Sequence, residues 1–204
     1  MKLLIACVLL ATYTAFCYCQ SVPEARSINK MKFAKELLEG NQPLYLFRAV
    51  HPSYIWTGNN TFICWTSKRT DVIDQRPPHL KQTQLGVPHN ITYYNVTQSG
   101  STALDSKLGA WTVRGNMVTL QTRNRDTQPK IRSEWPLVEA QQHCMVLGKH
   151  INTNNAICLY WASPNSEIEN ELCEAAYKNN CSMGFGTRYD MHEKCDEKNV
   201  PKKP

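Results

Sequence analysis

The chain has 204 residues, of which 42% are hydrophobic and 20% charged, and its formal net charge is +6 at pH 7. This length is sufficient for one domain with a substantial core. The basic residues are scattered apart from the Lys202–Lys203 tail, so we expect a solvated basic surface and no nucleic-acid or heparin partner.

Residues 1–19 are expected to be a secretory signal peptide. A lysine near the start precedes an apolar run from Leu3 to Phe16 that contains no charge. Small residues at Ala15/Cys17 or at Cys17/Cys19 suit cleavage by a signal peptidase. The run is too short for a stable membrane span, and no later stretch approaches about 18 apolar residues. We therefore expect a secreted, extracellular protein that does not insert into membranes.

The first predicted element after the signal is a helix from Glu24 to Glu39, where apolar residues recur at helical spacing and Gly40 follows as a stop. Short runs rich in strand-forming residues come next, separated by turns that contain Asn, Gly or Pro. The eight runs cover residues 44–50, 61–70, around 83–87, 90–98, 108–115, 117–123, 136–149 and 155–162. Short strands at such regular spacing favour a mainly β fold, either an up-and-down barrel or a sandwich.

A second helix is predicted after the strands. Ser166 and Glu169 form an S-x-x-E capping box, in which each side chain bonds a backbone amide at the helix start. The apolar side of this helix would carry Ile168, Leu172 and Ala175/Ala176. No repeat or low-complexity linker interrupts the chain, so residues 20–204 are expected to form a single domain.

The cysteines indicate disulfides. Of the nine in the chain, Cys7, Cys17 and Cys19 fall in the expected signal peptide. The remaining six are Cys64, Cys144, Cys158, Cys173, Cys181 and Cys195. An even number in an oxidising compartment implies three disulfides, with fifteen possible connectivities.

Neither a metal centre nor an enzyme is expected. Zinc ligands usually lie two to four residues apart, and the cysteine spacing does not fit that pattern. The sequence contains no HExxH, no G-x-S-x-G and no phosphate-cradling loop. We therefore assign no catalytic residue, no metal ligand and no cofactor.

Glycosylation is expected on the surface of a secreted chain that carries N-x-S/T sequons. The four candidate sites are Asn59, Asn90, Asn95 and Asn180. The last is the weakest, because the middle residue of its sequon is Cys181, which is expected to be disulfide-bonded.

The spacing of the later cysteines resembles that of a known family. CMV begins at Cys144, CLY begins at Cys158 after eleven intervening residues, and Cys173 follows after twelve more. Together with the helix–strands–helix layout, this pattern resembles the salivary lipocalins of ticks over essentially the whole mature chain. The resemblance implies an eight-stranded antiparallel barrel around a small-ligand cavity, with the two helices packed outside. It also implies the disulfides Cys64–Cys195, Cys144–Cys173 and Cys158–Cys181.

The amine-binding members of that family carry two acids that this chain lacks. Met145 stands where the family has an aspartate, and Cys158 stands where it has a glutamate. A buried ammonium needs a carboxylate to replace its water, whereas methionine suits an irregular hydrophobic ligand. If Cys144 faces out toward the helix, alternation turns His143, Met145 and Leu147 inward.

The cavity lining is predicted from aromatic, apolar and basic strand residues. The ligand-binding candidates are Phe47, Arg48, Trp65, Tyr93, Trp111, Arg114, His143, Met145 and Tyr160. Alternative or additional lining residues are Leu46, Phe62, Tyr94 and Leu120, because the sequence does not fix the strand registers. The two arginines and the histidine would pair with a ligand carboxylate, as a leukotriene or fatty acid requires.

The expected function is sequestration of a small hydrophobic host ligand, an eicosanoid, fatty acid or sterol, by a monomer secreted in saliva to dampen host inflammation and immunity. An alternative is a scavenger of histamine or serotonin with a relocated carboxylate. The candidates for that carboxylate are Asp71, Asp74, Asp105, Glu134 and Glu139. A further alternative is an immunomodulator that contacts a host immune-cell receptor.

Overall fold

The computed structural model describes residues 27–51, 60–71, 86–122, 132–164, 171–182 and 187–202. The expected signal peptide, the sequon at Asn59, the acid Asp74 and the capping box of Ser166 and Glu169 lie outside the described residues. Within these ranges, no helix is long and apolar enough to cross a membrane.

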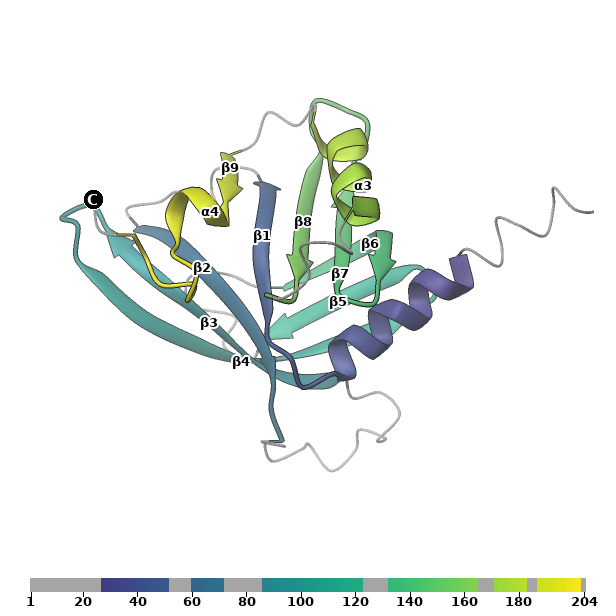
Figure 1. Cartoon of the computed structure of the whole chain (residues 1–204), viewed down its shortest axis with the longest axis horizontal. Helices are drawn as coiled ribbons and strands as arrows, with labels where there is room; N and C mark the ends of the chain where they lie inside the picture. The colour runs from purple at the N-terminus through teal and green to yellow at the C-terminus, as the bar shows by residue number, and fades with distance from the viewer. Residues whose placement is uncertain are drawn as a thin grey trace, which may run out of the picture.

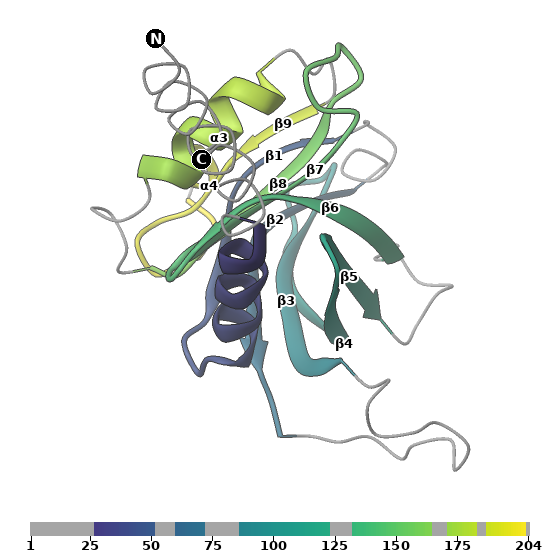
Figure 2. The same ribbon diagram turned by 90° about the vertical axis from the view of Figure 1, so that its right-hand side faces the viewer.

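The strands form one antiparallel sheet that closes on itself. They are β1 (Leu44–His51), β2 (Asn60–Arg69), β3 (Val87–Thr97), β4 (Thr102–Arg114), β5 (Met117–Thr122), β6 (Arg132–Gln141), β7 (Cys144–Lys149), β8 (Ile157–Ala162) and β9 (Thr187–Asp190). Neighbours from β2 to β8 follow chain order, and β1 pairs with β8 on one side and with β2 on the other. Strands β1–β8 therefore make the expected eight-stranded barrel rather than a sandwich (Figure 1, Figure 2).

The predicted number of barrel strands is correct, although one predicted run is wrong and another lies mostly outside the described residues. The run 136–149 is two strands, because β6 ends at Gln141, a turn follows, and β7 begins at Cys144. The run around 83–87 is not a separate strand in the part that the structure describes, where β3 begins at Val87. Its earlier residues lie outside the described ranges.

The helix of residues 27–39 lies against the end of the barrel where β1 begins (Figure 1). Its side chains Ala34, Leu37 and Leu38 are buried in the same cluster as the barrel interior. Lys30 makes an ion pair with the buried Glu139 of β6, with 3.2 Å between Nζ and Oε2. We call this helix-covered end of the barrel the floor, and the opposite end, where β3 turns into β4, the far end.

The C-terminal segment completes the barrel wall between β1 and β2. These two strands pair at only two positions near the floor, Leu44 with Ser67 and Tyr45 with Thr66. Nearer the far end, β9 takes the free edge of β1 instead. The helix α4 (Met191–Lys194) follows β9, and the backbone then reaches the disulfide between Cys64 and Cys195. The strand β9 was not predicted from the sequence.

Hydrogen bonds reinforce that junction from the same segment. The Tyr189 hydroxyl accepts the backbone N–H of Cys64 at 3.0 Å. The side-chain amide of Asn199 donates to the carbonyl of Cys64 at 3.1 Å and lies 2.8 Å from the Thr66 hydroxyl. Residues 187–202 therefore hold β2 in place where β1 does not reach it.

All three expected disulfides are present, namely Cys64–Cys195, Cys144–Cys173 and Cys158–Cys181. The last two tie β7 and β8 to the outer helix α3 (Glu171–Cys181). They turn Cys173, Tyr177 and Cys181 toward the barrel, so the predicted apolar side is wrong in the described part of this helix, while Ile168 lies outside the described residues. Leu172, which was expected to pack, is 52% exposed.

Candidate functional site

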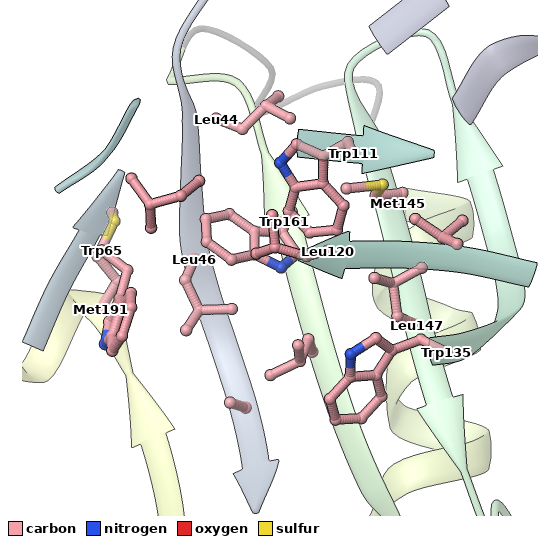
Figure 3. Packing of buried hydrophobic residues seen from close by; sticks show 14 of the residues in the cluster. Leu44, Leu46, Trp65, Trp111, Leu120, Trp135, Met145, Leu147, Trp161 and Met191 are labelled. Carbon is pink, nitrogen blue, oxygen red and sulfur yellow. The ribbon is translucent and has the colours of Figure 1, made fainter. Parts of the chain in front are cut away.

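Strand alternation divides the buried side chains into two groups. The outer cluster lies between the barrel and α3 and contains Val50, Cys144, Val146, Ala156, Cys158, Tyr160, Ala162, Cys173, Tyr177 and Cys181. The inner cluster lies inside the barrel and includes Leu44, Leu46, Trp65, Trp111, Leu120, Trp135, Met145, Leu147, Trp161 and Met191 (Figure 3). The inner cluster is the candidate site, because ligand sites are mainly apolar with a few placed polar groups.

A hydrogen-bonded chain near the floor joins the inner cluster to the N-terminal helix. The Trp111 indole N–H donates to the Ser67 hydroxyl at 2.9 Å, and this hydroxyl lies 2.9 Å from Nδ1 of His89. Nε2 of His89 lies 2.8 Å from the carbonyl oxygen of Leu38. A carbonyl only accepts, so Nε2 carries the proton and Nδ1 accepts from Ser67. Burial lowers the pKa of His89, and the charge of Arg69 acts in the same direction.

The indole N–H of Trp161 differs from that of Trp111, whose hydrogen bond is described above. Trp161 lies beside Trp111 with 5.9 Å between the ring centroids and is 3% exposed. Figure 3 shows both indoles among Leu44, Leu46 and Leu120. The Trp161 indole N–H is buried and has no hydrogen-bond partner. A buried donor without a partner costs about 1–3 kcal/mol, so this group can gain from an acceptor that enters the barrel.

Polar side chains line the inner face toward the far end. Tyr93 pairs with Asp105 across β3 and β4, and the next inward pair is Ile91 with Lys107. Side chains of directly opposed residues share a face, and Tyr93 and Ile91 are fully buried in the inner cluster. The Tyr93 hydroxyl donates to Oδ2 of Asp105 at 3.1 Å. Asp105 is therefore an inward carboxylate that is solvent-accessible at the far end.

Lys107 is a lysine inside the barrel that the sequence analysis did not single out. Its exposed fraction is 7%, and its strand neighbours at steps of two, Gly109 and Trp111, are also buried. Burial lowers the pKa of Lys107, while the negative charge of Asp105 opposes that change. The signal was available in the sequence, because Trp111 was expected to face inward and alternation places Lys107 on the same face.

Four of the predicted lining residues lie in the inner cluster, namely Trp65, Tyr93, Trp111 and Met145. Trp65 stacks against Tyr93 with 4.5 Å between ring centroids. The alternatives Leu46, Phe62 and Leu120 also belong to this cluster, and Tyr94 is partly buried against it.

The two predicted lining residues of β1 do not project into the barrel as expected. A register irregularity between Leu46 and Arg48 turns Arg48 outward and leaves Phe47, at the irregularity, partly buried against both the inner and the outer cluster. Arg48 binds the carboxylates of Glu174 and Asp190, and Phe47 lies against Tyr160. The cavity assignment of Arg48 is therefore wrong, whereas Phe47 contacts the inner cluster only in part.

The remaining basic and aromatic candidates also miss the inner face. Tyr160 packs against Tyr177 of α3, because it lies two residues from Cys158, whose disulfide fixes that face outward. Arg114 is exposed at the end of β4. It follows the inward Val113, so alternation turns its side chain to the outer face. His143 lies in the turn before β7 and is half-buried, outside the strand whose alternation the prediction used.

A site for a protonated amine needs a carboxylate on the inner face, and most of the candidate acids that the structure describes lie elsewhere. Glu139 faces the N-terminal helix, where it pairs with Lys30, and Glu134 and Asp71 are exposed. Among the strand residues that the structure describes, Asp105 is the one carboxylate on the inner face. No group of three or more His, Cys, Asp or Glu that could hold a metal occurs in the described ranges.

The described sequons have different environments. Asn90 of β3 is exposed on the outer face. Asn180 is half-buried beside the disulfide of Cys181, and its amide donates to the carbonyl of Ala176 at 2.7 Å. Asn95 lies at a step of two from Tyr93 on the inner face, and its amide oxygen is buried without a hydrogen-bond partner.

No known protein family and no curated protein matches the chain by sequence. Solved structures do match its fold. Japanin from Rhipicephalus appendiculatus bound to cholesterol has a TM-score of 0.51 and 12% identity, over 78% of this chain and 98% of that chain. AM182 in complex with serotonin has a TM-score of 0.44 and 12% identity, over 77% and 87%. Apocrustacyanin C2 has a TM-score of 0.42 and 12% identity, over 76% and 77%.

Proposed function

We propose that this chain, which has the lipocalin fold, binds a small and mainly hydrophobic ligand inside its barrel and acts by holding that ligand. A barrel of eight strands has an interior of the size that side chains fill or a small ligand occupies. The inner cluster offers tryptophan, leucine and methionine side chains to such a ligand. Methionine adapts to irregular apolar molecules, and tryptophan offers a large apolar surface to them.

The observation that carries the proposal is the unpartnered indole N–H of Trp161. A core selected for packing alone would pair this donor or replace the indole by an apolar side chain. Trp111, in the same cluster, has its N–H bonded to Ser67, so the fold can satisfy an indole where that is the requirement. The donor of Trp161 fits an oxygen acceptor on an otherwise apolar ligand.

The proposed ligand class is an eicosanoid, fatty acid or sterol, and the proposed action is sequestration of a host mediator. The cholesterol complex of Japanin supports a sterol-sized molecule as one member of this class. The three disulfides support an oxidising, extracellular setting. Secretion in saliva, glycosylation, action as a monomer and a role in dampening host immunity remain parts of this proposal.

An amine scavenger is the second candidate, because Asp105 places a carboxylate on the inner face. Its carboxylate already accepts the Tyr93 hydroxyl and faces the charge of Lys107. A bound ammonium would compete with that lysine for the same acid, so we favour the lipid class over histamine or serotonin.

The first experiment is to produce the protein with its disulfides, extract what co-purifies and identify it by mass spectrometry beside the native mass. A hydrophobic molecule bound one to one is the expected result. Delipidated protein is then titrated with a sterol, a fatty acid, histamine and serotonin in a calorimeter. Tight binding of an amine with no lipid uptake would replace the lipid proposal by the amine scavenger. If none of these binds, the function lies at the outer surface, as receptor contact would require.

A nuclear magnetic resonance measurement tests the role of Trp161 itself. The chain has five tryptophans, so the indole N–H resonances are few, and Trp161→Phe identifies the one of interest by its disappearance. We expect that resonance to move most when an oxygen-bearing ligand binds. An indole N–H shift confined to the other tryptophans would contradict the proposed hydrogen bond.

A further inference from the structure

We propose that the far-end cluster, defined as Tyr93, Asn95, Asp105 and Lys107, binds a neutral hydroxyl group of the ligand and selects alcohols over carboxylic acids. The proposal deepens the function proposed above and rests on it. It also assigns Asn95 to the ligand site rather than to glycosylation.

The register of β3 and β4 places these side chains in one column on the inner face. From the far end toward the floor, the paired positions are Asn95 with Ala103, Tyr93 with Asp105, and Ile91 with Lys107. No register shift interrupts the pairing of the two strands, so the inward positions stay in step. On the neighbouring strand, Phe62 pairs with Asn95 and belongs to the inner cluster. Asn95 therefore borders the apolar interior.

The charges of the cluster compensate one another. Asp105 carries a negative charge, and Lys107, which is 7% exposed, carries a positive one that interacts with it. The hydroxyl of Tyr93 is already donated to Asp105. A ligand carboxylate would add a second negative charge beside Asp105, and a neighbouring like charge disfavours the ionised form of the ligand.

Asn95 supplies the positive reason for a hydroxyl. Its amide oxygen is buried and lacks a hydrogen-bond partner, so it can accept a hydrogen bond from a ligand donor. An ionised carboxylate only accepts hydrogen bonds, whereas a hydroxyl donates one and accepts others. A ligand hydroxyl would donate to the amide oxygen of Asn95, which an ionised carboxylate cannot do.

The same geometry decides between the two uses of Asn95. A glycan on this residue would have to leave through the inner face, where Phe62 and Tyr93 are buried beside it. Asn90, on the same strand, is exposed on the outer face and offers no such obstacle. We therefore expect a glycan at Asn90 and none at Asn95 when the chain is secreted from a eukaryotic cell.

The selectivity is tested with dodecanol, dodecanoate and dodecane, which share one chain length and differ at the end group. Binding is followed by quenching of tryptophan fluorescence at pH 7. We expect dodecanol to bind at least about tenfold more tightly than dodecanoate, which corresponds to about 1.4 kcal/mol. Asp105→Asn should shift the preference toward dodecanoate, because the substitution removes the negative charge that repels the ligand carboxylate. Asn95→Leu should weaken dodecanol by about tenfold and leave dodecane unchanged.

Asn90→Leu is the matched control, because it makes the same change on the outer face of the same strand and should alter neither affinity. Circular dichroism and thermal unfolding verify that each variant folds. Tighter binding of dodecanoate than of dodecanol to the unmodified chain would overturn this inference and leave the proposed function intact. Glycan occupancy at Asn95, measured by peptide mass spectrometry, would also overturn it. If neither dodecane nor its derivatives bind, the proposed function fails together with the inference.

Discussion

The two faces of the barrel wall bury side chains from the same strands but treat polar groups differently. Outside, the disulfides of Cys144 and Cys158 fix α3, and Arg48 is paired with Glu174 and Asp190. Inside, the N–H of Trp161 and the amide oxygen of Asn95 are buried without partners. The outer face thus concentrates stabilising links, whereas the inner face retains groups that a bound molecule can satisfy. Substitutions on the two faces should therefore separate stability from binding.

The largest expected effect is on the outer face. Replacing Cys144 and Cys173 together by alanine removes a bridge that closes a loop with a sequence separation of 29. In the chain-entropy description this lowers the free energy of unfolding by about 3.6 kcal/mol. Denaturant unfolding of the double variant measures the loss, while ligand affinity at low temperature should be unchanged. A large loss of affinity in the folded variant would mean that α3 also shapes the interior.

The converse separation is expected for Trp161→Phe on the inner face. The substitution keeps an aromatic ring but removes the unpartnered N–H, so ligand affinity should fall by about tenfold, or roughly 1.4 kcal/mol. Calorimetric titration measures the change. Tyr177→Phe, which removes one polar atom from the outer cluster, is the control and should leave affinity unaltered. Equal effects of the two substitutions would contradict the division between the faces.

A smaller effect is expected for Arg48→Met. The Arg48 side chain is 33% exposed, so solvent screens its two ion pairs, and their loss should cost about 1 kcal/mol of stability or less. Affinity for both a fatty acid and a sterol should remain unchanged, because the guanidinium faces α3 and β9. A selective loss of fatty-acid binding would restore the role in carboxylate binding that the sequence suggested.

The smallest effect concerns pH and the buried His89 at the floor. Its pKa is lowered in the folded chain, so the unfolded chain binds the proton more readily. Stability is therefore complete above the usual histidine pKa of about 6.5 and declines as the pH falls through the lower pKa of the folded state. Chemical unfolding at a series of pH values should show this decline in the unmodified chain and a flatter profile in His89→Gln. The exposed His192→Gln is the control, and a profile identical for all three proteins would rule out His89 as the titrating group.

The sequence predicted most of the strands because their composition and turns are local features. Which face of the sheet a side chain occupies depends less on the local sequence. Side chains alternate between the two faces of a strand, and counting from the outward Cys144 correctly predicted that Met145 faces inward. Counting in the same way from Cys158 would have predicted that Tyr160 faces outward. The irregularity after Leu46 depends on how β1 meets β8, so the sequence of β1 alone could not reveal that Arg48 faces out.

The polar part of the site was missed for a different reason. A lysine in a strand is usually exposed, so Lys107 was read with the scattered surface charges. Asn95 was assigned to glycosylation because its sequon is a local signal, whereas its burial depends on pairing with β2 and β4. The break between β6 and β7 was missed because the residues at the turn include no glycine or proline.

The position of the last strand also affects how the protein is made. Residues 187–202 complete the wall between β1 and β2, and Cys195 reaches back across a separation of 131 residues to Cys64. A chain emerges from the ribosome N-terminus first, so β1 and β2 are synthesised well before the residues that close the wall between them. Cys64 therefore stays without its partner thiol until Cys195 has been made. The barrel wall, and with it the enclosure of a ligand, is completed only when that later segment has been added.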